Sequence, residues 1–245
     1  MSMLDRKLRR DVWRMRSQMV SIAAVVGGGI AGVLAMGSTL ESIRASRDAY
    51  YASAHFAQVF ASLKRAPELV AGEIAAIPNV DAVETRVTAS ALMRVLRNAR
   101  MATAHIVSIP VARHPMLNEL HLRRGREPAP GRNTEVLVGE HFALANHIDV
   151  GDSLQAVING RWEVLRVVGI ALSPEFVENI SVEFPQFPDN TIFGILWMSR
   201  EALGPLYGMD HAFNDVVVSL APGANDQPVI AALDTLLAPY CAPTR

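Results

Sequence analysis

Residue types that could carry chemistry are present, but their spacing does not assemble a recognisable site. Seven histidines are scattered without metal-ligand spacing, and no H-E-x-x-H, C-x-x-C, G-x-S-x-G or Walker A pattern occurs. The single cysteine, Cys241, excludes an internal disulfide and any multi-cysteine metal site. The sequence therefore predicts a protein that is not an enzyme and that has no catalytic residue, metal or cofactor. The histidines are His55, His105, His114, His121, His141, His147 and His211.

Two polar stretches are weaker candidates for a site. Asp210, His211, Asn214 and Asp215 lie close together, but no nucleophile accompanies them, so turn and cap roles are the better interpretation. The basic run 121–126 could contact an anionic ligand or a lipid headgroup. Because the total charge is balanced, a solvated loop is favoured there.

A glycine motif near the N-terminus has two interpretations. Gly27, Gly29 and Gly32 match G-x-G-x-x-G, which in a dinucleotide-binding fold follows a strand and opens an amphipathic helix. Here the residues after the glycines are as apolar as those before them, which argues against that fold. Ala24, Gly28 and Gly32 are spaced by four, a small-residue face that lets a second membrane helix approach closely. We predict this helix-packing role, although glycine is frequent in membrane helices in any case.

The glycines lie in an uncharged run, residues 17–40, that is long enough to span a bilayer. Six basic side chains lie in the sixteen residues before it, and this asymmetry predicts a cytoplasmic N-terminus with the rest of the chain outside. The run is too long for a typical cleaved signal peptide, and a buried soluble helix would not need the basic preamble. The whole chain has 23 Lys+Arg against 24 Asp+Glu, which excludes a strongly cationic nucleic-acid binder.

The remaining residues predict an α+β fold. A helical stalk is expected over 41–55, followed by a strand at 56–63, a helix with Pro67 in its first turn, and a strand at 80–87. A second β-α unit begins at 213–220, with Asn225 or Asp226 as the helix cap. Two such halves form a split, ferredoxin-like, porter-type domain over 56–89 and 207–245. Its closing strand would follow Tyr240, and the sequence ends five residues later.

A mainly-β subdomain is expected between these halves, over 90–206. Strands are predicted at 101–109, 135–138 and 193–198, and short helices at 141–146 and 199–203. Asn159-Gly160 is a strong turn signal and predicts a hairpin between strands 153–158 and 162–170. The complete organisation is a cytoplasmic segment 1–16, a membrane helix 17–40, the stalk, and the split domain with its insertion.

Seven stretches of this sequence form a pattern that covers nearly the whole chain, and none of them is a catalytic motif. They are residues 3–13, 44–51, 59–67, 120–126, 169–176, 193–198 and 212–216. In these stretches the chain resembles the FtsX/MacB-type ABC transporter permeases.

The resemblance implies a first transmembrane helix, a MacB-like periplasmic core domain and further membrane helices that meet an ATP-binding subunit. Those later helices are not in this sequence, so we expect a truncated permease component that passes conformational change between its inner-membrane helix and its extracytoplasmic domain. Its partners would be the lipid bilayer, the ATP-binding subunit and other permease segments or a second permease copy, with no nucleic acid. The alternative is a stand-alone, membrane-anchored binding or sensor module. The DNA beyond codon 245 would distinguish the two.

Overall fold

The structure is a computed structural model that describes residues 13, 15–95, 100–110, 117–176 and 189–241. It divides into two compact units, Met1–Tyr50 and Tyr51–Arg245, which we treat separately. The first unit is dominated by one helix, α2 (Arg16–Ser53), which continues three residues into the second unit. Its stretch Arg16–Ile43 is long and apolar enough to cross a membrane by length and composition. The sequence predicted this continuous helix across the uncharged run and the stalk.

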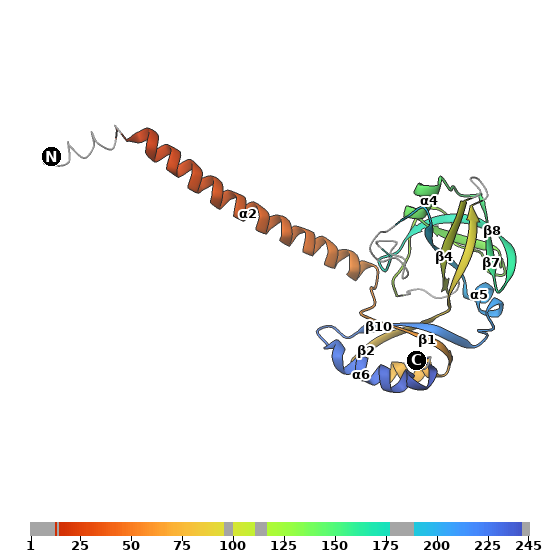
Figure 1. The fold of residues 1–245 in the computed structure, drawn as a ribbon. Coiled ribbons are helices and arrows are strands. Elements are labelled where there is room, and N and C mark those ends of the chain that lie inside the picture. Colours follow the sequence, from red (N-terminus) through yellow and green to blue (C-terminus); the bar gives the residue numbers. More distant parts are fainter. Residues whose placement is uncertain (1–12, 14, 96–99, 111–116, 177–188, 242–245) are drawn as a thin grey trace, which may run out of the picture. The chain divides into compact units, whose positions relative to one another are not determined.

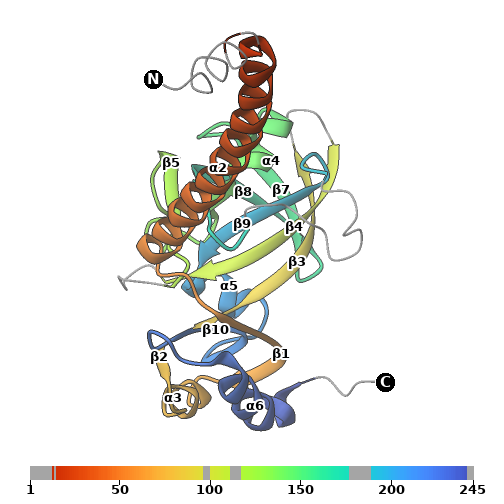
Figure 2. The same cartoon turned by 90° about the vertical axis from the view of Figure 1, so that its left-hand side faces the viewer.

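The second unit contains a small lobe built on a three-stranded sheet, which we call the sheet lobe. In this sheet β10 (Ala212–Leu220) lies between β1 (Val59–Pro67) and β2 (Val80–Arg86) and runs antiparallel to both. Helices α3 (Val70–Ala75) and α6 (Asp226–Leu237) cover one face of the sheet (Figures 1 and 2). A short 3-10 helix, η1 (Ala238–Tyr240), follows α6.

Apolar spacing and capping explain the two helices of the sheet lobe. Val70 and Ile74 of α3 recur at helical spacing and are buried. The Asn225 side chain caps α6 by accepting a hydrogen bond from the Gln227 amide at 3.2 Å. The buried face of α6 carries Val229, Leu233 and Leu237. The predicted helices and the Asn225 cap are therefore confirmed.

The first strand of this lobe differs from the prediction. It begins at Val59 rather than Phe56, and Pro67 is its last residue instead of a residue in the first turn of α3. Proline is tolerated there because β1 is an edge strand that ends at this residue. The described residues contain no fourth strand to close a ferredoxin-like sheet.

The larger lobe is a β-barrel. Within the described residues its strands form a sheet of order β5-β8-β6-β9-β4-β3-β7, and β7 also pairs with β8. The pairing closes a ring because the first half of β8 pairs with β7, while its second half pairs with β6 and β5. The strands are β3 (Thr88–Val95), β4 (Arg100–Ile109), β5 (His121–Gly125), β6 (Glu135–Gly139), β7 (Ser153–Ile158), β8 (Arg161–Leu172) and β9 (Phe193–Ser199).

Local sequence explains the β7–β8 hairpin and part of the remaining barrel. Asn159 and Gly160 both have positive φ, 47° and 77°, as a tight two-residue hairpin turn requires. Short helices α4 (Glu140–Asn146) and α5 (Arg200–Leu206) follow β6 and β9, as predicted. The sequence did not predict β3 or β5. β5 is exposed at every residue, so backbone pairing with β8, rather than apolar alternation, makes it a strand.

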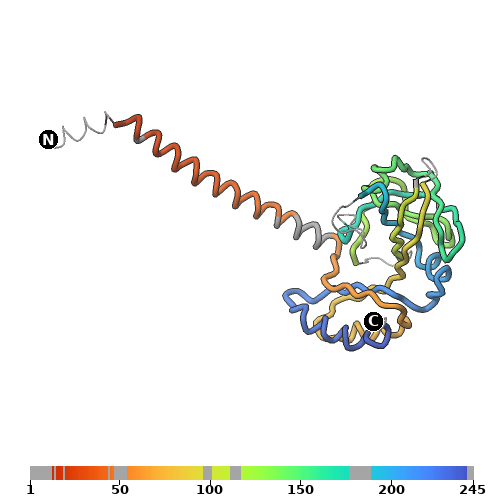
Figure 3. Tube along the Cα trace, viewed as in Figure 1, coloured from red at the N-terminus to blue at the C-terminus, as the bar shows by residue number. Residues whose placement is uncertain are grey.

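The chain passes from the sheet lobe to the barrel between β2 and β3, through Val87, and returns between α5 and β10 (Figure 3). Each lobe has its own apolar core. Val216, Phe213 and Ile74 are fully buried in the sheet lobe, and Ile106 and Leu196 are fully buried in the barrel. The barrel is therefore inserted into the sheet lobe, and polar side chains occupy the region where the two meet.

Candidate functional site

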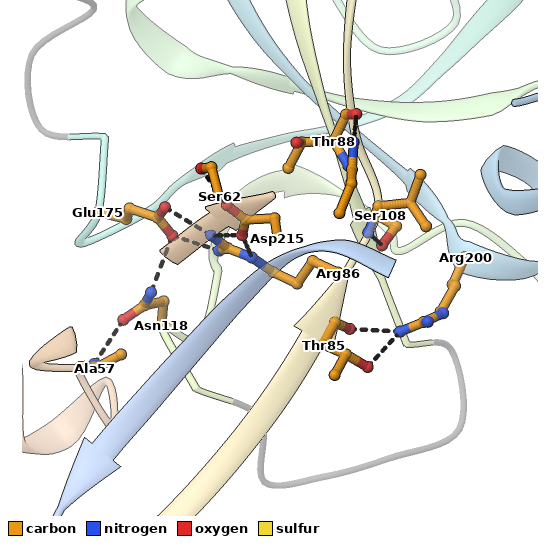
Figure 4. A network of polar contacts seen from close by, with 12 residues as sticks. Ala57, Ser62, Thr85, Arg86, Thr88, Ser108, Asn118, Glu175, Arg200 and Asp215 are labelled. Carbon is orange, nitrogen blue, oxygen red and sulfur yellow. Dashed lines mark hydrogen bonds and ion pairs between the residues drawn. The ribbon is translucent and has the colours of Figure 1, made fainter. Parts of the chain in front are cut away.

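A buried arginine lies where the sheet lobe meets the barrel (Figure 4). Arg86, the last residue of β2, is only 6% exposed. Its Nε donates to Asp215 Oδ1 of β10 at 2.7 Å, and its Nη2 donates to Glu175 Oε1, just after β8, at 2.9 Å. Ser62 Oγ donates to the second carboxylate oxygen of Asp215 at 3.1 Å. Arg86 therefore joins one carboxylate from each lobe.

Asn118 connects this arginine–carboxylate group to the chain that follows α2. Its Nδ2 donates to Glu175 Oε2 at 2.9 Å, and its Oδ1 accepts from the Ala57 amide at 2.9 Å. The backbone at Asn118 and Glu119 also donates to the carbonyls of His55 and Ala54, at 3.1 and 2.9 Å. We call Arg86, Asp215, Glu175 and Asn118 the junction cluster.

A second polar connection joins the lobes at α5. Arg200 Nη1 donates to Thr85 Oγ1 at 2.8 Å, and Nη2 donates to the Ala212 carbonyl at 3.0 Å. Asn214 binds both backbone groups of Thr88, with distances of 2.7 Å to its amide and 2.8 Å to its carbonyl. Both places where the chain crosses between the lobes are therefore held by side-chain hydrogen bonds.

Burial sets the electrostatics of the junction cluster. Burial disfavours the Arg86 charge, but the hydrogen bonds to Glu175 and the charge of Asp215 outweigh it, so the pKa of Arg86 is raised. Burial lowers the pKa of His105, and the charges of Asp215 and Glu175 only partly oppose this. Burial also raises the pKa of Glu84, although its carboxylate accepts a hydrogen bond from the Leu117 amide at 2.9 Å. The site holds one permanent cation between two carboxylates.

The polar residues at 210–215, for which turn and cap roles were predicted, follow that prediction only in part. His211 has a positive φ of 55°, which fits a turn. Asn214 and Asp215, however, lie within β10 and bind Thr88 and Arg86, so turn and cap roles are wrong for them. The physical reason is strand pairing over a long sequence distance, because β10 lies between β1 and β2 and its register places Asp215 directly opposite Arg86.

The basic run is also different from its prediction, because it is an edge strand and not a loop. Its arginines are neutralised by ion pairs, Arg123 with Glu140 at 3.3 Å, Arg124 with Asp149 at 3.1 Å and Arg126 with Glu135 at 2.7 Å. The hydrogen bond from Arg126 holds the pKa of Glu135 at about 2. These pairs leave the run poorly suited to an anionic ligand.

The scattered histidines do not come together as metal ligands in the described part of the chain. No group of three or more His, Cys, Asp or Glu residues there could hold a metal ion. His114 lies outside the described residues. Cys241 is exposed and free.

The glycine motif lies inside α2, so the strand that a dinucleotide-binding fold requires is absent from this described stretch. Ala24, Gly28 and Gly32 are exposed on α2. A Cβ atom built on Gly28 or Gly32 would have no neighbour within 4 Å among the described residues. Their packing against another helix stays a prediction. At the start of the helix, the Arg16 guanidinium lies over the Trp13 ring, 4.6 Å from its centroid.

Sequence reasoning missed Arg86, Glu175 and Asn118. Arg86 is 129 residues from Asp215 and 89 residues from Glu175, so no local spacing indicates that they meet. A charged residue at the end of an otherwise half-buried strand was the only available signal.

Two solved structures of transporter domains are similar to this chain. Its fold is similar to the periplasmic region of MacB from Actinobacillus actinomycetemcomitans, with 14% identity over 71% of this chain and 73% of that chain and a TM-score of 0.43. It is also similar to the extracellular domain of the noncanonic ABC-type transporter YknZ from Gram-positive bacteria, with 11% identity, 70% and 84% coverage and a TM-score of 0.45. No curated protein matches the sequence.

Because these two TM-scores are low, the family assignment rests on the sequence. Residues 20–236 match the family model of the MacB-like periplasmic core domain. The matched region includes most of α2, the whole barrel and nearly all of the sheet lobe. The expected resemblance is therefore confirmed, and the chain belongs to the MacB/FtsX-type permease family through its MacB-like periplasmic core domain.

Proposed function

We propose that this protein is a permease-family component of an ABC transport system that transmits conformational change between its N-terminal membrane helix and its extracytoplasmic domain. The junction cluster is the observation that supports this role. The segment 54–57 directly follows α2 and is hydrogen-bonded to Asn118 and Glu119. Asn118 in turn binds Glu175, which pairs with Arg86. A displacement of residues 54–57 would therefore reach both lobes through a few short polar contacts.

The proposal places α2 in the inner membrane as a single span, with the N-terminus in the cytoplasm. The six basic residues before the uncharged run support this orientation. The stacking of Arg16 on Trp13 suits a membrane interface, where amphipathic rings and arginines gather. A reporter fused after Ser42 should be active outside the cytoplasm, and a cytoplasmic signal there would contradict the orientation.

The sheet lobe is proposed to be the described part of a ferredoxin-like, porter-type domain. Its order, with β10 between β1 and β2 and helices on one face, supports this assignment. The proposed partners are an ATP-binding subunit and other permease segments or a second permease copy. We propose no catalytic step for the chain itself, since its candidate residues hold the lobes together.

The transmission role is tested by measuring the distance between the lobes. Spin labels at Leu144→Cys on α4 and Asp234→Cys on α6 report one lobe each, and both sites are exposed. Cys241→Ser removes the native thiol. The full chain, isolated from membranes with its ATP-binding subunit, should show a shifted distance distribution by pulsed electron paramagnetic resonance when ATP and vanadate are added.

An Asn118→Gly variant tests whether the junction cluster carries the change, because glycine accepts the positive φ of 53° at this position and removes only the side chain. It removes the contacts to Glu175 and Ala57, so the nucleotide-dependent shift should shrink while both lobes stay folded. Arg161→Ala, an exposed barrel substitution outside the cluster, is the control and should keep the shift. If the distance distribution of the spin-labelled chain with Asn118 intact did not change on addition of nucleotide, the proposal would be contradicted. That result would favour the stand-alone binding or sensor module.

A further inference from the structure

The outer face of the barrel has two apolar regions with different surroundings. One region is buried and includes Val107, Leu137 and Trp197. Partly buried side chains from outside the barrel strands, such as Leu120 and Phe176, pack against it. The other is open, and its large apolar side chains are roughly half exposed: Leu92 48%, Met101 41%, Trp162 49% and Val164 52%. An exposed cluster of large apolar side chains on a folded domain indicates an interaction surface.

Strand register places the open residues side by side. Met101 of β4 is opposite Arg94 of β3, Arg94 is opposite Gln155 of β7, and Gln155 is opposite Val164 of β8. These residues therefore form a continuous row across four strands. Leu92 is two residues from Arg94 in β3, and Trp162 is two residues from Val164 in β8, so both side chains point to the same outward side as this row. We call Leu92, Arg94, Met101, Gln155, Trp162 and Val164 the β3–β8 face.

The charge of the β3–β8 face has one sign. Its outward positions include Arg94 and, two residues beyond Val164, Arg166. The acidic residue in register beside Arg166 is Glu135 of β6, and its carboxylate is already paired with Arg126. The Arg94 guanidinium lies over the Trp162 ring, 5.1 Å from the ring centroid, and this cation–π contact holds the guanidinium in place. Neither arginine forms an ion pair with an acidic residue within the described segments. The arginines of β5, in contrast, are all paired.

We propose that the β3–β8 face binds an acidic segment of a partner protein. Apolar side chains of that segment would cover Leu92, Trp162 and Val164, and its carboxylates would pair with Arg94 and Arg166. Tryptophan and arginine in a desolvated centre are the residues that contribute most to protein–protein affinity. A membrane surface fits less well, because the apolar side chains lie half-buried on a strand surface and do not protrude from a loop tip.

The test uses the full chain in its own membranes. A benzophenone amino acid is introduced at Gln155, the centre of the face, and at Leu144 on α4 as an exposed apolar control. Illumination should link position 155, and not position 144, to a protein whose cross-linked peptide contains Asp or Glu. Arg94→Glu together with Arg166→Glu should lower the yield at least about fivefold, because like charges then oppose each other.

Reversing the acidic residues of the cross-linked peptide to arginine should restore the yield with the doubly reversed chain. If charge reversal lowers the melting temperature, Arg94→Gln with Arg166→Gln replaces it and should still reduce the adduct. The proposal would be overturned by lipid adducts at position 155 or by equal adducts at positions 144 and 155. It would also be overturned if neither set of arginine substitutions changed the adduct yield. Absence of any adduct at position 155 would overturn it as well.

Discussion

Arg86 carries the largest electrostatic consequence of any single side chain in the junction cluster. Its side chain is 7% exposed, and its partners Glu175 and Asp215 are 14% and 9% exposed. Taking these charges out of water is costly, and the cost is offset only while all three remain together. Single substitutions at this site should therefore have effects much larger than those at surface arginines.

Arg86→Met should lower the free energy of unfolding by about 3–5 kcal/mol, because it leaves two buried carboxylates without their cation. Chemical denaturation of the purified chain measures this change. Arg161→Met is the matched control, since Arg161 is exposed and has no ion pair among the described residues, and it should change stability by no more than about 0.5 kcal/mol. Similar small effects of both substitutions would show that the cluster contributes little to stability.

His105 gives the fold a dependence on pH. Because burial lowers the pKa of His105 in the folded state, the unfolded chain binds its proton first as the pH falls below about 6.5. The unfolded state is then favoured, so stability should decrease from pH 6.5 downward. His105→Gln should flatten this part of the profile, measured as melting temperature against pH. An unchanged slope in the variant would assign the dependence to other groups.

At the scale of elements, α4 is seated on β9 by a close approach of Phe142 to Gly194. A Cβ atom at position 194 would lie 2.7 Å from Phe142 Cγ, and Phe142 is fully buried. Gly194→Ala should therefore destabilise the barrel by about 1–3 kcal/mol through overpacking. Gly72→Ala in α3, where no atom lies within 4 Å, should instead be neutral or stabilising by up to about 1 kcal/mol. Thermal unfolding of the two variants compares them directly.

The small-residue face of α2 can be tested against the other side of the same helix. Gly28→Leu should weaken the approach of a second copy, because a large side chain separates the two backbones. In a Cys241→Ser background, oxidative cross-linking at Ser21→Cys in membranes reports this approach. Gly37, nine residues from Gly28, lies on the opposite side of a helix of about 3.6 residues per turn, so Gly37→Leu is the control. Equal yields for both leucine variants would contradict the packing face.

At the scale of the whole molecule, local signals predicted elements but not how they meet. The uncharged run, the Asn159-Gly160 turn and the Asn225 cap each act within a few residues, and each is found where expected. The strand β5 was missed because pairing with β8 holds a sequence that has no apolar alternation. The junction cluster was missed because its members approach only after both lobes have formed.

The central position of β10 has a consequence for the order of folding. β10 reaches β1 and β2 only after the whole barrel has been traversed, and its contact from Asp215 to Arg86 spans 129 residues. Closing so long a loop is slow unless the intervening chain is already compact. Pulse-labelling hydrogen exchange should therefore find amides of β4 and β9 protected before those of β10. Earlier protection in β10 would mean that the sheet lobe nucleates folding and that the barrel forms as its late insertion.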